Sequence, residues 1–344
     1  MKVSIIIPVY NVERYIQRCL ESVVAQQVMD VDIECILVDD CSTDDTMNLV
    51  RAFVDSYQGA VSFILLSHDK NRGPSAARNT GIDASSGDYI FYMDSDDRIS
   101  RDCISRLTAV LAEHPQADFV MGNIFHAKDQ TSYMPENEPV LVIDTQEELF
   151  RRLFDMKIPN SACNRLIRRE VLQRNQMRFT EGMLYEDLFW NYQFFLVIHY
   201  IVLLPDVTYI YEDNEGSIVN TTISRQNVVA ESFCHITDEI LSHMPPCLHT
   251  NALMYAITIL LKAIDVQILY DCNADVEQHI RRSRKQLMAT TLRSGRLLSA
   301  LFALLMYKPF SYLLQRAFMR RNYHRMSMMT TRIENVVDKV FSRI

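Results

Sequence analysis

The sequence predicts an α/β protein with a mainly parallel sheet and a helical C-terminal region. Apolar runs of strand length alternate with helical patterns four times within about 95 residues. Two of these runs end in acidic clusters, Asp39-Asp40 and Asp94-Ser95-Asp96-Asp97, and from residue 226 onward the pattern is almost wholly helical. Such alternation is typical of parallel α/β sheets, whose ligands bind beyond the carboxyl ends of the strands.

Four strands and three helices are predicted in the first hundred residues. Asn11 is expected to cap the first helix, whose apolar positions lie within Val12–Val24. Ser42 or Thr43 is expected to cap the second, and a third, Ala76–Ala84, follows a Gly-Pro-Ser break. The predicted strands are Val3–Val9, Ile33–Val38, Val61–Leu66 and Asp88–Met93.

Beyond residue 100 the pattern is less regular. A helix is expected over Ser100–Pro115 and a strand over Asp118–Phe125. Prolines at 135 and 139 in a polar stretch predict a loop over 126–145, and a mixture of short elements follows as far as residue 225.

The composition indicates a folded chain in a reducing compartment. Of its 344 residues 48% are hydrophobic, enough for one large domain or two ordinary ones. Eight cysteines occur without any C-x-x-C pair, so we expect neither a disulfide framework nor a zinc site. The first apolar run, Val3–Ile7, is too short for a secretory signal. These features predict a cytoplasmic protein.

Charge is divided unevenly along the chain. Residues 278–344 hold 14 Lys and Arg against 2 Asp and Glu, whereas residues 1–277 hold 21 against 41. A basic tail on an acidic body is typical of segments that meet an anionic partner, such as nucleic acid or a phospholipid surface. The alternative is a solvated basic helical face packed on the acidic body.

The same tail contains two apolar stretches, Leu297–Tyr307 and Phe310–Met319, separated by Lys308-Pro309. Because a membrane-spanning helix needs about 20 apolar residues, this interrupted pattern favours a helix that lies in the membrane interface. A buried helical hairpin is the alternative. We expect peripheral contact with the inner face of the cell membrane, and no nucleic-acid partner.

Asp94-Ser95-Asp96 places two carboxylates one residue apart after a predicted strand. Mg²⁺ or Mn²⁺ held by one or two carboxylates keeps coordination positions for phosphate oxygens, so the pattern indicates a diphosphate site. Alone the motif is weak, since acidic turns after strands are often merely solvated or cap a helix.

Three further residues support a nucleotide site. Asp40 follows another strand and can accept the N3 proton of a uracil ring, and Tyr10 can stack on the base. Arg78, near the start of the third helix, can bind a diphosphate with its planar fork. The alternatives are that Asp40 caps a helix, Tyr10 is a core residue and Arg78 pairs with a surface carboxylate.

Glu186-Asp187 lies between apolar and aromatic residues. A carboxylate so placed can have a raised pKa and act as a general base. From the residues alone, the surface turn of an amphipathic helix is the better interpretation.

Four segments in order resemble the signatures of glycosyltransferase family 2: Val3–Asn11, Val38–Thr43, Gly73–Asn79 and Met93–Asp97. The resemblance is strong over residues 1–125 and is extended thinly to about 220 by Asn164-Arg165-Leu166, Tyr185-Glu186-Asp187 and Gly216-Ser217-Ile218. It implies a GT-A fold, a Rossmann-like mixed sheet flanked by helices. The domain would be 1–225, with a donor half (1–125) and an acceptor half (126–225), before a helical region (226–344).

The resemblance also implies an inverting enzyme that uses Mn²⁺ or Mg²⁺ to move a sugar from a nucleotide-diphosphate sugar to a glycan or lipid-linked acceptor. We expect the donor to be UDP-linked. Asp187 would take the proton of the acceptor hydroxyl during one displacement. Its implied donor contacts are Pro8, Val9, Tyr10, Asp40, Arg78, Asp94 and Ser95; its metal ligands are Asp96 and Asp94; and its catalytic pair is Asp187 and Glu186.

The chain departs from the family pattern at three positions. Cys41 stands where glycine is usual, Arg165 where lysine is common, and Glu212 where an arginine often follows the tyrosine. The last departure bears on how phosphate or acceptor is handled.

Three other classes of protein are less well supported. An aspartate phosphatase requires a small hydroxyl residue where this chain has Arg98, and a dinucleotide-binding oxidoreductase requires a G-x-G-x-x-G that is absent after the first strand. An inactive donor-site relic that serves as a membrane-bound subunit is the non-enzymatic alternative, and the intact set of aspartates argues against it.

Overall fold

The computed structural model describes residues 1–293 except 136–137, 155–156, 213, 215–225, 244–252 and scattered positions between 254 and 271. The chain divides into two compact units, residues 1–224 and 225–344.

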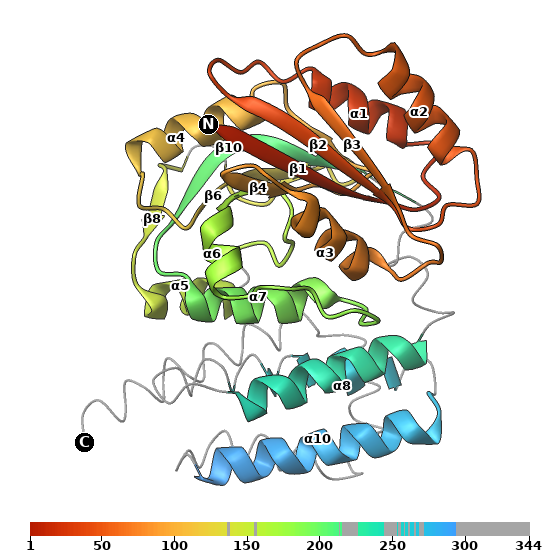
Figure 1. Ribbon diagram of the computed structural model, residues 1–344. Coiled ribbons are helices and arrows are strands. Elements are labelled where there is room, and N and C mark those ends of the chain that lie inside the picture. Colours follow the sequence, from red (N-terminus) through yellow and green to blue (C-terminus); the bar gives the residue numbers. More distant parts are fainter. Residues whose placement is uncertain are drawn as a thin grey trace. The chain divides into compact units, whose positions relative to one another are not determined.

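The first unit is built on one mixed sheet (Figure 1). Its strands are β1 (Lys2–Val9), β2 (Asp32–Asp39), β3 (Ser62–Ser67), β4 (Tyr89–Tyr92), β5 (Arg98–Ile99), β6 (Phe119–His126), β7 (Thr131–Ser132), β8 (Leu141–Ile143), β9 (Arg165–Arg168) and β10 (Ile201–Tyr211). The order is β3-β2-β1-β4-β9-β6-β10-β5, with β7 beside β6 and β8 beside β10. The predicted α/β sheet is confirmed.

The first four strands are parallel and have helices on both faces. β1 pairs with β2 on one side and with β4 on the other, and β3 pairs with β2. Helices α1 (Ile16–Val24) and α2 (Thr46–Ser56) cover one face and α3 (Pro74–Ala84) covers the other (Figure 1), as right-handed crossovers require. Because both faces are covered, Ile5, Ile6 and Ile7 are all completely buried, which explains the continuous apolar run of β1.

This arrangement reverses the direction of strand addition next to β1, since β2 and β3 lie on one side of it and β4 on the other. Open α/β sheets bind ligands at such a reversal, outside the carboxyl ends of the strands. Tyr10, Asp40 and Asp94 all follow carboxyl ends of these strands.

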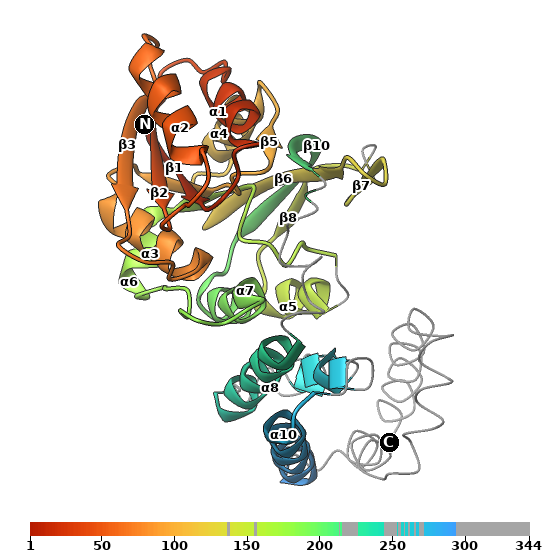
Figure 2. The same cartoon turned by 90° about the vertical axis from the view of Figure 1, so that its right-hand side faces the viewer.

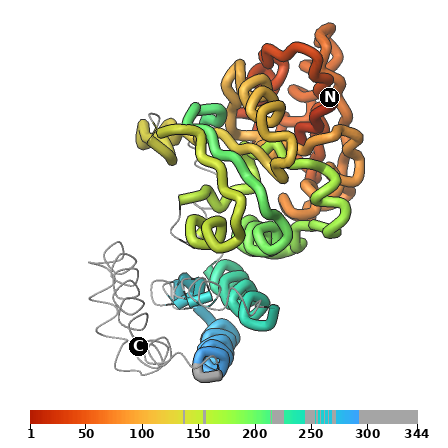
Figure 3. The backbone as a smooth tube through the Cα atoms, turned by 90° about the vertical axis from the view of Figure 1, so that its left-hand side faces the viewer, coloured from red at the N-terminus to blue at the C-terminus, as the bar shows by residue number. Residues whose placement is uncertain are grey.

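The second half of the sheet is joined to the first by the short antiparallel strand β9. Leu166 lies opposite Phe91 of β4 and opposite Val120 of β6. Beyond β9, β6 and β10 run parallel and side by side (Figure 3). The register of β10 shifts between Leu203 and Val207, around Pro205, which has no N–H to donate to the ladder.

The described part of this unit contains four more helices: α4 (Cys103–Glu113), α5 (Gln146–Phe154), α6 (Arg169–Arg174) and α7 (Glu186–Val197). Helix α4 packs against β6 and β10, and α5 contacts α7. Tyr185, which precedes α7, has a left-handed backbone with φ 58°, and this tight turn sets the direction in which the first residues of α7 point.

The second unit contains α8 (Gln226–Ser242) and α10 (Ala274–Arg293), which pack side by side (Figure 2). His279 of α10 joins them, with Nε2 3.0 Å from Asp238 and Nδ1 bonded to Glu231. None of the described helices is long and apolar enough to cross a membrane. The predicted interfacial stretches, 297–307 and 310–319, lie outside the described residues.

Two helix caps were predicted wrongly. Helix α1 begins at Ile16, because Asn11 instead accepts the backbone N–H of Thr43 with its side-chain oxygen at 2.8 Å. Helix α2 begins at Thr46, since Ser42 accepts the backbone N–H of Asn11 at 3.2 Å. These polar residues tie the loops after β1 and β2 to each other.

The predicted loop over 126–145 is also partly wrong, because it contains the short strands β7 and β8.

Candidate functional site

Asp40 fastens a loop at the carboxyl end of β2. Its carboxylate accepts the backbone N–H groups of Arg72 at 2.9 Å and Gly73 at 2.6 Å, and lies 2.7 Å from Nδ1 of His68. His68 reaches Thr80 of α3 with its other nitrogen. A carboxylate has about four acceptor positions, so three of those of Asp40 are already used within the protein.

The three other residues predicted around the base differ in accessibility. Tyr10, which follows β1, is 44% exposed. Pro8 is half-buried. Val9 is completely buried, and its carbonyl accepts the N–H of Asp40 at 2.8 Å. Tyr10 is therefore the one of the three with a ring free to stack on a ligand.

The turn after β4, residues 94–97, is held by the end of β10. The Tyr209 hydroxyl donates to Asp97 at 2.7 Å and accepts the backbone N–H of Asp94 at 3.1 Å. The other oxygen of Asp97 accepts the N–H of Glu212 at 2.9 Å. Asp97 is 1% exposed, so it fixes the turn rather than meeting a ligand. The sequence signalled it only as a third aspartate in the cluster.

Asp94 and Asp96 present their carboxylates on this turn, and Ser95 between them is buried. The Asp94 side chain is 35% exposed. Burial raises the pKa of Asp96, and the neighbouring charge of Asp94 raises it further, although the amide of Asn214, at 2.8 Å, opposes the shift. Two crowded carboxylates of this kind are stabilised by a bound cation.

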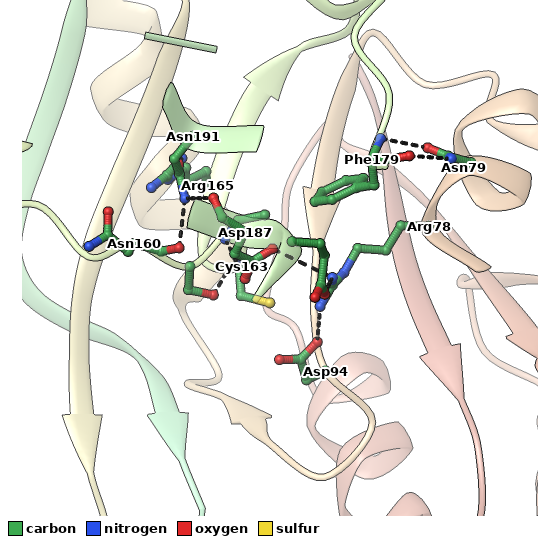
Figure 4. A network of polar contacts seen from close by, with 12 residues as sticks. Arg78, Asn79, Asp94, Asn160, Cys163, Arg165, Phe179, Asp187 and Asn191 are labelled. Atoms are coloured by element: carbon green, nitrogen blue, oxygen red, sulfur yellow. Dashed lines mark hydrogen bonds and ion pairs between the residues drawn. The ribbon is translucent and has the colours of Figure 1, made fainter. Parts of the chain in front are cut away.

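Arg78 joins the two halves of the domain (Figure 4). Its Nη2 donates to Asp94 at 2.9 Å, and its Nη1 donates to Glu186 at 2.6 Å and to Asp187 at 3.5 Å. Arg78 is 4% exposed, and its guanidinium lies over the Phe179 ring at 5.1 Å. A residue predicted to meet the donor is thus bonded to the carboxylates predicted to act on the acceptor.

Aromatic side chains pack behind the Arg78 guanidinium, with Phe179 in contact with it. Phe179 stacks on Trp190 at 4.9 Å and meets Tyr92 edge-on at 5.4 Å. Asn79 fixes Phe179 through two hydrogen bonds with its backbone, both 2.9 Å (Figure 4). No sequence signal pointed to Phe179, which lies outside the motifs.

Asp187 differs from Glu186 in ways that suit it to proton transfer. Its side chain is 22% exposed against 8% for Glu186, and its contact with Arg78 is the longer one. Burial raises the pKa of Asp187 to about 7; Arg78 opposes the rise, and Glu186 and Asp94 add to it. Its second oxygen accepts the N–H of Ala162 at 3.3 Å. A carboxylate with a pKa near the working pH is a suitable general base.

Glu212, one of the three departures from the family pattern, pairs with two neighbouring arginines. Glu212 pairs with Arg98 at 2.6 Å and with Arg18 at 3.7 Å, and Arg18 also donates to the carbonyl of Asp96 at 3.0 Å. Positive charge therefore lies beside the turn even though position 212 is acidic.

Among the described residues, no group of three or more His, Cys, Asp or Glu side chains is placed to hold a metal ion. Asp94 and Asp96 are two carboxylates on one turn, and Mg²⁺ held by one or two carboxylates keeps coordination positions for phosphate oxygens.

Comparison with known proteins identifies the family of the chain. The model of the family described as glycosyl transferase family 2 matches residues 4–175. GlyG, a glycosyltransferase of Streptococcus pneumoniae, is 31% identical over 229 residues, which cover 64% of this chain and 73% of GlyG. GlyA of the same organism is 31% identical over 228 residues, 63% of this chain but only 31% of GlyA.

Solved structures share the fold. The crystal structure of Staphylococcus aureus TarS 1–349 in complex with UDP-GlcNAc has a TM-score of 0.66 at 20% identity, covering 89% of this chain and 91% of that one. The mannosyltransferase PcManGT of Pyrobaculum calidifontis, in complex with GDP-Man and Mn²⁺, has a TM-score of 0.55 at 18% identity, covering 92% and 86%. The predicted GT-A fold is confirmed, and the chain belongs to glycosyl transferase family 2.

Proposed function

We propose that this chain is an inverting glycosyltransferase that moves a sugar from a UDP-sugar to a hydroxyl of a glycan or lipid-linked acceptor. The observation that carries the proposal is the cluster around Arg78, where Asp94 of the donor half meets Glu186 and Asp187 of the acceptor half. A site for displacement at a sugar carbon needs a charged end for the leaving diphosphate and a base for the attacking hydroxyl. This cluster contains both.

The donor is proposed to be UDP-linked. The exposed residue Tyr10 offers an aromatic ring for stacking. Asp40 is 3% exposed, and one of its about four acceptor positions is not used by His68, Arg72 or Gly73; we assign this position to the N3 proton of uracil. The structural likeness to TarS, which was solved with UDP-GlcNAc, supports the same choice.

Asp96 and Asp94 are proposed to hold Mn²⁺ or Mg²⁺. Their crowded carboxylates fit such a cation, and a related fold was solved with Mn²⁺. When bound, the cation would supply positive charge to the departing diphosphate.

The chain's own residues then divide the work. Asp187 takes the proton of the acceptor hydroxyl, and Glu186 holds Arg78 in place through its 2.6 Å bond. Arg78 keeps positive charge between the base and the donor end of the site, where negative charge develops on the leaving group.

The acceptor is proposed to belong to cell-surface polysaccharide synthesis. A relative that is 33% identical over 114 residues is named poly(ribitol-phosphate) beta-N-acetylglucosaminyltransferase TarS. The basic tail would keep the enzyme at the inner face of the membrane, where a lipid-linked acceptor is presented.

Titration calorimetry with UDP-sugars, with Mn²⁺ and with excess chelator, tests the donor site. We expect tighter binding with the cation, and we expect Asp96→Asn to lose this difference. Asp83→Asn is the matched control, because Asp83 is an exposed carboxylate paired with Arg178. Equal affinity in chelator would exclude the metal role, and a preference for another base would count against Asp40 as the uracil reader. Absence of sugar transfer by the wild-type chain with every donor that binds would refute the function.

A further inference from the structure

Arg165 of β9 is a completely buried cation. Phe119 and Phe195 stack on each other with ring centroids 6.4 Å apart, and the guanidinium lies beside this pair, 5.2 Å from the Phe119 ring and 5.5 Å from the Phe195 ring. It donates Nη1 to the side-chain oxygen of Asn191 and Nη2 to the carbonyl of Pro159 at 2.7 Å, while Nε has no partner. Within the described part of the chain it forms no ion pair.

Such a group is costly to bury. Burial lowers the pKa of Arg165 to about 10, so the side chain stays charged at neutral pH. An apolar residue would pack beside the two phenyl rings without the desolvation penalty. The role of Arg165 therefore lies in the contacts that its guanidinium makes.

These contacts lead to the candidate base (Figure 4). Asn191, which accepts from Arg165, donates its amide to the carbonyl of Asn160 at 2.6 Å and to the backbone carbonyl of Asp187 at 2.8 Å. Arg165 and Asn191 thus bind the carbonyls of two consecutive residues, Pro159 and Asn160. Two residues later, the N–H of Ala162 donates to the carboxylate of Asp187 at 3.3 Å.

We propose that Arg165 is a positioning residue that acts through Asn191 and the loop 159–162 to aim the Asp187 carboxylate at the acceptor hydroxyl. This inference rests on the proposed function, because it assigns Asp187 the role of base. Arg165 itself touches neither donor nor acceptor, since its side chain is enclosed.

Arginine and lysine differ in this role. The planar guanidinium donates in two fixed directions at once, here to Asn191 and to Pro159. A lysine keeps the charge but concentrates its donors on one nitrogen, so it can hold one of the two partners well and the other poorly.

The test compares wild type with Arg165→Met, Arg165→Lys and Arg168→Met. Arg168 is the matched control, because it lies on the same strand, donates to the carbonyls of Pro115 and Ala117, and lies over the ring of Tyr89, away from Asp187. The readouts are kcat, the donor KM, the thermal midpoint, and hydrogen exchange of the peptide covering residues 157–164.

For Arg165→Met we expect kcat to fall by about 10², the usual cost of misplacing a catalytic group by about 1 Å, with donor KM within about threefold. Exchange should rise in residues 157–164 and not across the sheet. Arg165→Lys should recover part of the loss, and Arg168→Met should match wild type in kcat and in the exchange of this peptide.

Unchanged kcat and unchanged local exchange in Arg165→Met would overturn the inference, as would a rise in donor KM that accounts for the whole loss of activity. If Arg165→Met does not fold, Asn191→Ala breaks the same link, with the same results expected. If both variants unfold, Arg165 is a core residue only and the inference fails. Failure of the proposed function is distinguished by an inactive wild type, and the exchange experiment needs no activity.

Discussion

The pKa of Asp187 predicts how turnover depends on pH. Burial raises this pKa to about 7, against the opposing charge of Arg78, and Glu186 and Asp94 raise it further. A general base works only when it is ionised. Transfer should therefore be lost as the pH falls through 7 and should reach a plateau above it.

The size of the effect follows from the fraction ionised. With a pKa of about 7, roughly 9% of the base is ionised at pH 6, half at pH 7 and roughly 91% at pH 8. Turnover is thus expected to rise about tenfold between pH 6 and pH 8, most of it below pH 7.5.

The assay is kcat at saturating donor and acceptor across this range, with donor affinity measured in parallel by calorimetry. If donor affinity stays level while kcat rises with pH, the pH dependence belongs to the chemical step. A kcat that is level between pH 6 and pH 8, with chemistry rate-limiting, would refute Asp187 as a base with a raised pKa.

Asp187→Asn should lower transfer by about 10² or more with donor affinity within a few-fold, since it removes the base; near-normal transfer would move the role to Glu186. Glu34→Gln tests a buried structural carboxylate, whose pKa burial tends to raise but which hydrogen bonds from Lys2 and neighbouring serines lower to about 2. Because the unfolded value is about 4.5, its contribution of about 3 kcal/mol is present above pH 4.5 and is lost as the pH falls toward 2. Denaturant titration should find Glu34→Gln less stable at pH 7 and less sensitive to acid, and equal stability would contradict the assignment. In co-sedimentation, the full chain should bind anionic vesicles at low salt and lose most binding at about 1 M salt, where the Debye length is about 3 Å; a folded chain truncated at about residue 277 that binds equally well would exclude the tail.

The sequence was informative where burial leaves a local pattern. Strands β1 and β2 are covered on both faces, so they are continuous apolar runs, and the acidic residues after β2 and β4 follow from the parallel arrangement. By contrast, β10 is interrupted by Pro205 and its register shift, and its pattern does not show a strand that long.

The connections within the site could not be predicted from local patterns. Arg78 and Glu186 are separated by 108 residues, and no periodicity shows that the fold brings them within 2.6 Å. The helix-cap predictions were wrong for a similar reason. Asn11 and Ser42 accept backbone N–H groups of each other's loops and not those of the helices that follow them. A polar residue before a helix indicates a capping capacity, whereas its actual partner depends on the tertiary structure.

The position of β9 in the sheet affects how the chain folds while it is being synthesised. β4 and β6 each pair with β9, residues 165–168, which is synthesised after both of them. As the chain leaves the ribosome, the edges of β4 and β6 that face β9 therefore stay unpaired until about forty residues beyond 126 have emerged, and the other edge of β6 stays unpaired until β10 follows. A chain cut at the end of the donor half would keep those edges open and should aggregate. We therefore expect the proposed donor half, although it is a continuous stretch of sequence, not to fold independently.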